Sequence, residues 1–252
     1  MFSLKSKVAV VTGASSGLGI QFAKALARQG ADVAVLARRK GMIEKTAEEV
    51  SSLGVKSLAV VCDVSKTDEI QRALSEIIKT FGKVDILVNN AGVGIGAPAE
   101  TMTDEVWNTV IDINLGSTFR VTREFVKEMK KNGSGRIINI SSTCGVVGGT
   151  FASLNYYASK GGIIQLSRAQ AANYAKYNIT VNVIAPGFFL SEMTEDYIDS
   201  DGVKDLVSKI PLKRIGKPGE LDGALIYYAS DESAYTTATV LLVDGGQTQA
   251  FF

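Results

Sequence analysis

Hydrophobic residues are distributed along the chain in two alternating patterns. Short runs rich in Val and Ile recur, and between them the apolar positions follow helical spacing. A strand covered on both faces of a sheet requires a continuous apolar run, whereas a helix packed on that sheet is apolar on one side only. The runs that predict strands are KVAVVT (7–12), ADVAVLA (31–37), SLAVVC (57–62), VDILVN (84–89), GRIINIS (135–141), ITVNVI (179–184) and TVLLV (239–243). The segments with helical periodicity are 17–29, 41–53, 66–81, 103–131, 156–176 and 218–229.

Strands that alternate with helices predict an α/β fold with a doubly wound parallel sheet flanked by helices. We find no linker, repeat or low-complexity tract, so residues 1–252 are expected to form a single domain. Two connections are longer than this fold usually needs, the Gly-rich segment 145–154 and the segment 186–211. The second follows a strand end, where ligands bind in open α/β sheets, so we predict that it covers a substrate.

The amino-acid composition excludes several classes of binding partner and of catalytic site. Lys+Arg 27 against Asp+Glu 26 leave a net charge of +1, so neither a nucleic acid nor an anionic membrane is expected as a partner. The chain has no histidine, which excludes Ser-His-Asp triads, histidine bases and histidine-ligated zinc. Cys62 and Cys144 form no CxxC pair, so we predict reduced thiols and no metal site. The first apolar run is too short for a secretory signal, and we expect a cytoplasmic protein.

A glycine-rich turn links the first predicted strand to the first predicted helix. The stretch VVTGASSGLGIQFAKAL places Gly13, Gly17 and Gly19 in this turn. Glycines let the backbone turn sharply and approach a pyrophosphate, and the N-terminus of the following helix offers unpaired N–H groups to the phosphates. The position between a strand and a helix favours a dinucleotide site over a purely structural turn.

The spacing of this turn resembles the signature Thr-Gly-x-x-x-Gly-x-Gly of the short-chain dehydrogenase/reductase family, with Thr12 as its first residue. Further motifs of that family follow in order: CDVS (62–65), NNAG (89–92), NLG (114–116), NISS (139–142), YYASK (156–160), NVIAPGFF (182–189) and VDGG (243–246). The resemblance implies a Rossmann-type fold and hydride transfer with a nicotinamide cofactor. It also implies a homotetramer or homodimer.

The end of the second strand bears on the choice of cofactor. NAD enzymes usually carry an acidic residue there, which binds the adenosine ribose. In this chain the place falls at Ala37, and Arg38 and Arg39 follow. A guanidinium binds a 2′-phosphate through two charge-assisted hydrogen bonds, whereas a carboxylate would repel it. We predict NADP(H), with Arg38 as the first candidate for the clamp and NAD(H) as the alternative cofactor. The alternative role of both arginines is a solvated helix start.

Two adjacent tyrosines precede Lys160. Tyr156 stands four residues and Tyr157 three residues before it, and both offsets are close on a helix. The family pattern Tyr-x-x-x-Lys selects Tyr156 and leaves Tyr157 as a packing aromatic or pocket wall. Because a nearby ammonium favours a phenolate, we expect Lys160 to lower the pKa of Tyr156. Tyr156 would then exchange a proton with the substrate oxygen.

The resemblance assigns further roles. Ser142 would donate a hydrogen bond to the substrate oxygen, and Asn114 would kink a helix and hold a proton-relay water beside the lysine. The implied catalytic residues are Asn114, Ser142, Tyr156 and Lys160. The implied cofactor-binding residues are Gly13, Ser15, Ser16, Gly17, Leu18, Gly19, Arg38, Arg39, Asp63, Val64, Asn90, Ala91, Gly92, Tyr156, Lys160, Pro186, Gly187, Phe189 and Ser191.

The expected activity is interconversion of a small-molecule ketone and a secondary alcohol. A sugar acid such as gluconate is the first candidate substrate, and a steroid or other apolar ketone is an alternative. Another alternative is a 3-oxoacyl-carrier-protein reductase, although Gly133 and Tyr177 stand where such enzymes carry docking arginines. Lys130, Lys131 and Lys176 could substitute for them. An NADP(H)-sensing binding protein without turnover is the non-enzymatic alternative.

Overall fold

Seven parallel strands form one sheet, with their carboxyl ends along a common edge. The computed structural model describes residues 1–149, 153–189 and 201–249. The strand order is β3-β2-β1-β4-β5-β6-β7, and every pairing between neighbours is parallel. Strands β2 and β4 lie on opposite sides of β1, so the order of the strands reverses between β1 and β4. In open sheets of this kind a ligand-binding crevice forms at the carboxyl ends of the two strands where the order reverses. The strands are β1 (Val8–Thr12), β2 (Asp32–Ala37), β3 (Ser57–Val61), β4 (Ile86–Asn89), β5 (Gly135–Ile140), β6 (Ile179–Pro186) and β7 (Val240–Val243).

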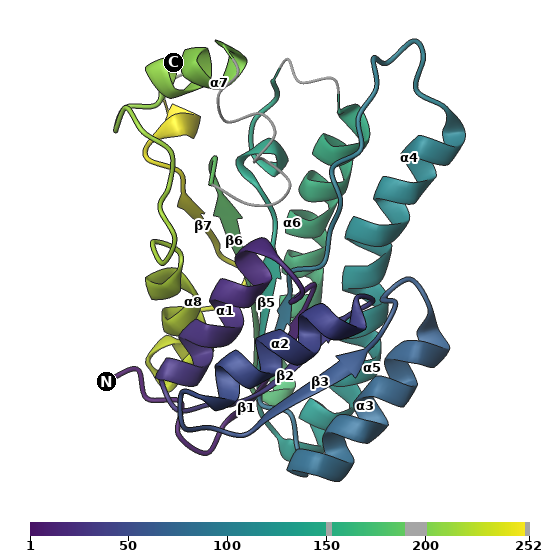
Figure 1. Ribbon diagram of the computed structural model, residues 1–252, viewed down its shortest axis with the longest axis vertical. Coiled ribbons are helices and arrows are strands. Elements are labelled where there is room, and N and C mark those ends of the chain that lie inside the picture. The colour runs from purple at the N-terminus through teal and green to yellow at the C-terminus, as the bar shows by residue number, and fades with distance from the viewer. Residues whose placement is uncertain (150–152, 190–200, 250–252) are drawn as a thin grey trace.

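Helices cover both faces of this sheet (Figure 1). On one face lie α1 (Gly17–Arg28), α2 (Lys40–Ser51) and α8 (Asp222–Ala229). On the other lie α3 (Thr67–Phe81), α5 (Ser117–Asn132) and α6 (Leu154–Tyr174). Two further helices, α4 (Asp104–Val110) and α7 (Asp201–Lys209), extend beyond the carboxyl ends of the strands. The predicted fold class is therefore confirmed.

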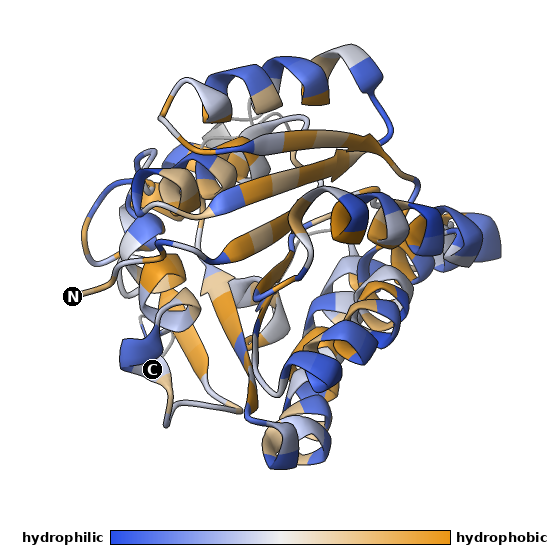
Figure 2. Ribbon diagram, turned by 90° about the horizontal axis from the view of Figure 1, so that it is seen from below, coloured by the Kyte–Doolittle hydropathy of each residue, from blue (hydrophilic) through white to orange (hydrophobic). Residues whose placement is uncertain are grey.

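The core follows from the two patterns of the sequence. Every residue of β1 and of β6 is buried, as a strand between two helical layers requires. Helix α3 buries only the stripe Ile70, Ala73 and Ile77, and it ends at Gly82, whose φ of 80° closes the last turn. Figure 2 shows the result as apolar strands between helices whose outer sides are polar. Each fully buried Ile or Leu contributes about 2 kcal/mol of transfer free energy.

Two features depart from the predicted elements. The predicted helix 103–131 consists of α4 and α5, joined by a wider π-helical turn at Ile111–Gly116. The predicted covering segment 186–211 contains α7, which the sequence analysis did not assign, and its residues 190–200 lie outside the described ranges. Among the described helices none is long and apolar enough to cross a membrane.

Candidate active site

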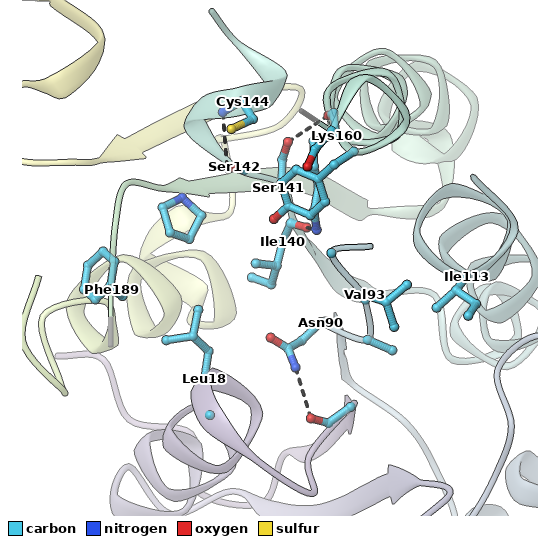
Figure 3. A pocket seen from close by; sticks show the side chains of 18 of the residues that line it. Leu18, Asn90, Val93, Ile113, Ile140, Ser141, Ser142, Cys144, Lys160 and Phe189 are labelled. Carbon is cyan, nitrogen blue, oxygen red and sulfur yellow. Dashed lines mark hydrogen bonds between the residues drawn. The ribbon is translucent and has the colours of Figure 1, made fainter. Parts of the chain in front are cut away.

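A cavity of about 1100 Å³ lies at the carboxyl ends of the strands. One end is formed by residues that follow β1, β2 and β3, and the other by residues that follow β5 and by the first turns of α6. Figure 3 shows Leu18 and Asn90 on one side of the cavity, with Ser142, Cys144 and Lys160 on the other. Cavities that bind one small ligand usually measure about 300 to 1,000 Å³, so this cavity has room for an extended ligand and a second small molecule.

The glycine-rich turn between β1 and α1 leaves no space for side chains. A Cβ atom on Gly19 would lie 2.3 Å from the carbonyl oxygen of Gly13, and one on Gly13 would lie 2.8 Å from Cα of Ala91. Asn90 fixes the turn from the neighbouring strand, because its Nδ2 donates to the carbonyl oxygen of Thr12 at 3.0 Å. No side chain caps the N-terminus of α1 and its first turn has no acidic residue, so the backbone N–H groups are available to an anion.

Two arginines line the cavity at the end of β2, beside the buried Ala37. The sequence analysis named Arg38 as the first candidate for the clamp, and the structure adds that Arg39 is hydrogen-bonded to the glycine-rich turn. Its guanidinium donates to Oγ of Ser15 at 3.1 Å and to Oγ of Ser16 at 2.8 Å. The structure therefore places the Arg39 guanidinium beside the hydroxyls of Ser15 and Ser16, which makes Arg39 a candidate for the clamp beside Arg38. The preference for Arg38 stays a prediction.

The loop after β3 contributes Asp63 and Val64 to the same end of the cavity. Partial burial disfavours the charged carboxylate of Asp63, but hydrogen bonds from the backbone N–H and the hydroxyl of Ser65 hold its pKa below the usual value. Asp63 is thus an ionised acceptor with a fixed orientation. It can accept a hydrogen bond from a polar ligand at this end of the cavity.

Ser142, Tyr156 and Lys160 meet at the opposite end of the cavity. Tyr156 and Ser142 share a side-chain hydrogen bond, and Nζ of Lys160 lies 5.4 Å from the centre of the Tyr156 ring. Ser142 Oγ also accepts a hydrogen bond from the backbone N–H of Cys144 at 3.1 Å, which directs the serine hydrogen toward Tyr156 or a ligand. The hydroxyl of Tyr157 points instead toward Gly149, where a Cβ would lie 2.3 Å from it. The structure therefore brings Tyr156 into hydrogen-bond contact with Ser142 and directs the hydroxyl of Tyr157 toward Gly149.

Loss of hydration is the largest influence on the pKa values of Tyr156 and Lys160. It raises the pKa of Tyr156 above its usual value, although the hydrogen bond from Ser142 acts in the opposite direction. It also lowers the pKa of Lys160 to about 8, because the ammonium is almost completely buried. The expected lowering of the Tyr156 pKa is therefore not seen in the protein alone, since loss of hydration raises the pKa more than the hydrogen bond with Ser142 lowers it. The phenol is protonated at neutral pH and can serve as an acid.

Asn114 lies behind the cavity, completely buried in the π-helical turn. Its Oδ1 accepts from the backbone N–H of Val93 at 2.8 Å, and its Nδ2 donates to Val93 O and to Ser159 Oγ. The Ser159 hydroxyl in turn donates to the carbonyl oxygen of Tyr156 at 2.8 Å. Asn114 therefore connects the segment after β4, through Ser159, to the backbone of Tyr156.

A second buried amide makes a parallel connection. Asn155 is completely buried, and its Nδ2 donates to the carbonyl oxygens of Ile95 at 3.0 Å and Val106 at 3.3 Å. Its Oδ1 accepts from the backbone N–H of Tyr156 at 2.8 Å. Both backbone polar groups of Tyr156 are thus tied to one cavity wall, the segment 93–98. The sequence analysis did not single out Asn155 or Ser159, because their partners lie far away along the chain.

The remaining predicted residues are distributed as follows. Pro186, Gly187 and Phe189 line the cavity beyond β6, Gly19 packs behind the glycine-rich turn, and Ser191 lies outside the described ranges. The other predicted cofactor residues line the cavity, and these are Gly13, Ser15, Ser16, Gly17, Leu18, Arg38, Arg39, Asp63, Val64, Asn90, Ala91, Gly92, Tyr156 and Lys160. The lining residues that the sequence analysis did not assign to the site include Val93, Ala97, Pro98, Cys144, Val203, Leu206 and Gln247. Within the described ranges no cluster of His, Cys, Asp and Glu could hold a metal ion.

Comparison with known proteins agrees with this geometry. The family profile described as short chain dehydrogenase matches residues 7–201. The 3-oxoacyl-(acyl-carrier-protein) reductase of Staphylococcus epidermidis is 39% identical over 96% of this chain and 98% of its own. A gluconate 5-dehydrogenase from Burkholderia cenocepacia, solved with NADP and tartrate, superimposes with a TM-score of 0.94 at 32% identity, covering 98% of this chain and 97% of that one. The NADPH-dependent 3-quinuclidinone reductase of Rhodotorula rubra gives 0.91 at 35% identity, covering 98% and 93%. The chain belongs to the short-chain dehydrogenase family of oxidoreductases acting on CH–OH groups.

Proposed function

We propose that the protein is an NADP(H)-dependent oxidoreductase that interconverts a ketone and a secondary alcohol, with Tyr156 as the acid and base. The observation that carries this proposal is the contact of Tyr156 with Ser142 and Lys160 at one end of a cavity whose other end presents a glycine-rich turn and two arginines. The same cavity thus offers a dinucleotide site and a proton donor.

The residues of the cavity fit a dinucleotide phosphate. The turn at Gly13 and Gly19 admits a close approach to the backbone, and the uncapped N-terminus of α1 would face the pyrophosphate. Arg39, with Arg38 beside it, supports NADP(H), because Ala37 brings no carboxylate against a 2′-phosphate. The Burkholderia and Rhodotorula proteins, one solved with NADP and the other NADPH-dependent, support the same preference. When bound, the reduced cofactor supplies the hydride.

The side chains at the other end would handle the proton. Ser142 donates a hydrogen bond to the carbonyl oxygen, because its own oxygen already accepts from Cys144 N–H. Tyr156 gives its phenolic proton to the same oxygen as negative charge develops there. The Lys160 ammonium stabilises the resulting phenolate, and its Nζ is held in place by the carbonyl oxygen of Ile140 at 3.0 Å. The raised pKa of Tyr156 keeps the phenol protonated in the protein alone, as a proton donor to the carbonyl oxygen must be.

Reduction of a 3-oxoacyl group on a carrier protein is the second candidate. It is supported by the 39% identity with the Staphylococcus reductase over nearly the full length of both chains. At the end of α5, Nζ of Lys130 lies 4.6 Å from the centre of the Tyr177 ring, which forms a cationic and aromatic surface suited to an acidic carrier. This surface lies at the opposite end of α5 and α6 from the cavity (Figure 1).

We also propose a homotetramer or homodimer. Trp107 on α4 and Phe119 on α5 are large apolar side chains that are 39% and 47% exposed, as in surfaces that pack against another copy. Light scattering after size exclusion tests this, and a monomer at micromolar concentration contradicts it.

Consumption of NADPH, followed by its absorbance, tests the proposed function. Purified protein is supplied with NADPH and a panel of cyclic ketones, keto acids, keto esters and a 3-oxoacyl thioester. Turnover of at least one ketone, lost in Tyr156→Phe, supports the proposal. Tight NADPH binding without turnover of any compound supports the sensing protein instead.

A further inference from the structure

The walls around Ser142 and Tyr156 indicate the charge of the substrate. We infer that this site takes an uncharged carbonyl compound with apolar flanks and discriminates against one that carries a carboxylate near the carbonyl. This inference rests on the proposed function and names its substrate class.

The first observation is the apolar character of the walls. The segment after β4 contributes Val93, Ala97 and Pro98, and α7 contributes Val203 and Leu206. Tyr157 adds an aromatic ring beside the catalytic tyrosine. An apolar wall stabilises a substrate by removing carbon from water, but it does not replace the hydration that a carboxylate loses.

The second observation concerns the cations of the cavity, of which one is buried behind Tyr156 and the other two lie at the opposite end. Lys160 is 5% exposed, and its Nζ donates to the carbonyl oxygen of Ile140 at 3.0 Å. Arg38 and Arg39 follow β2, whereas Ser142 follows β5, and these strands are separated by β1 and β4 in the sheet. Three strand spacings amount to about 14 Å, so neither arginine reaches a carboxylate at the reacting carbon. Among the described lining residues these three are the cationic ones.

The third observation comes from the sequence of the remaining residues. Residues 150–152, 190–200 and 250–252 contain neither Lys nor Arg. They contain four carboxylates instead, at Glu192, Glu195, Asp196 and Asp199. Wherever these segments lie, they add no cation that could pair with an anionic substrate.

A matched pair of substrates tests the inference. Acetoacetamide and acetoacetate have nearly the same shape and the same keto group, but only the acid is charged. We expect kcat/KM with NADPH to be at least about 10-fold higher for the amide, because the site has no partner for the carboxylate. Ethyl acetoacetate should resemble the amide. Added salt should narrow the gap if acidic residues repel the acid, and it should leave the amide unchanged.

A cation placed in the α7 wall, the part of the cavity lined by Val203 and Leu206, supplies the complementary test. Leu206 is partly exposed and lines the cavity, so Leu206→Arg can be accommodated without burying a charge. We expect Leu206→Arg to lower the amide-to-acid ratio at least about 5-fold, whereas the uncharged control Leu206→Gln leaves the ratio as it was. If Leu206→Arg and Leu206→Gln give the same ratio, the α7 wall does not set the preference and the inference is overturned.

The outcomes separate this inference from the proposed function. Equal or better use of acetoacetate by the unchanged protein overturns the inference alone, because the chemistry at Tyr156 would still operate. If the protein binds NADPH but reduces neither these compounds nor any ketone of the panel, the proposed function fails and the inference fails with it.

Discussion

Replacement of Asn155 by leucine tests how Tyr156, the proposed acid and base, is held in place. Leucine has nearly the same size as asparagine but makes no hydrogen bonds. The change removes the two bonds donated to Ile95 O and Val106 O and the bond accepted from Tyr156 N–H. The Tyr156 N–H keeps a second acceptor, the carbonyl oxygen of Ser153 at 2.9 Å.

The magnitude follows from these contacts. Net contributions of about 1 kcal/mol for each of the two donated bonds give a loss of about 2 kcal/mol in the free energy of unfolding. The rate should suffer more, because the first turn of α6 is released from the wall formed by residues 93–98. A displacement of about 1 Å at a reacting group can cost about 100-fold in rate, so we expect kcat to fall about 10- to 100-fold.

The assay compares Asn155→Leu with Asn182→Leu. Asn182 is equally buried in β6, where it donates to Thr236 O and accepts from Thr239, away from the first turn of α6. The dissociation constant of NADPH, measured by fluorescence, should stay within about 2-fold in both variants, since neither asparagine lines the cavity. The pH midpoint of kcat should shift in Asn155→Leu only. Equal losses of kcat in the two variants, at equal folded fractions and without a pH shift, would refute the positioning role of Asn155.

Three further predictions concern charge. Burial lowers the pKa of Lys160 from 10.5 to about 8 and thereby destabilises the folded protein by about 3 kcal/mol. This cost is fully present below pH 8 and vanishes above pH 10.5. Lys160→Met should therefore raise the free energy of unfolding in urea by up to that amount at pH 7 and by much less at pH 10.5. In the same way, kcat/KM for reduction should fall as the pH rises through about 8, because Lys160 loses its charge, and a flat profile from pH 6 to 10 contradicts this. Arg39→Ala should weaken NADPH binding at least about 10-fold and NADH binding little, measured by fluorescence, and an unchanged NADPH-to-NADH ratio would leave Arg38 as the clamp.

The fold was predictable because its elements depend on local patterns. Seven apolar runs are long enough for buried strands and too short for buried helices, and each became a strand of the sheet. Helix α7 was missed although Val203, Leu206, Val207 and Ile210 recur at helical spacing, because residues 186–211 were interpreted as one covering segment.

The residues of the candidate site were predictable only where a short sequence motif of the family assigns them a role. The Tyr-x-x-x-Lys spacing identified Tyr156, and the structure brings it to Ser142. The hydrogen bonds of Arg39 to the hydroxyls of Ser15 and Ser16 depend on how the glycine-rich turn folds, which no spacing reveals. The direction of the Tyr156 pKa likewise depends on desolvation, a property of the folded cavity.

The measurement that tests the central claim most directly is single-turnover reduction of a ketone by Tyr156→Phe with saturating NADPH. This variant keeps the ring and loses only the phenolic proton, while the matched variant Tyr157→Phe loses the neighbouring hydroxyl. We expect Tyr156→Phe to lower the rate by about 100- to 10,000-fold with NADPH affinity preserved, and Tyr157→Phe to lower it far less. A Tyr156→Phe protein that reduces the ketone at the rate of the unchanged protein would contradict the account.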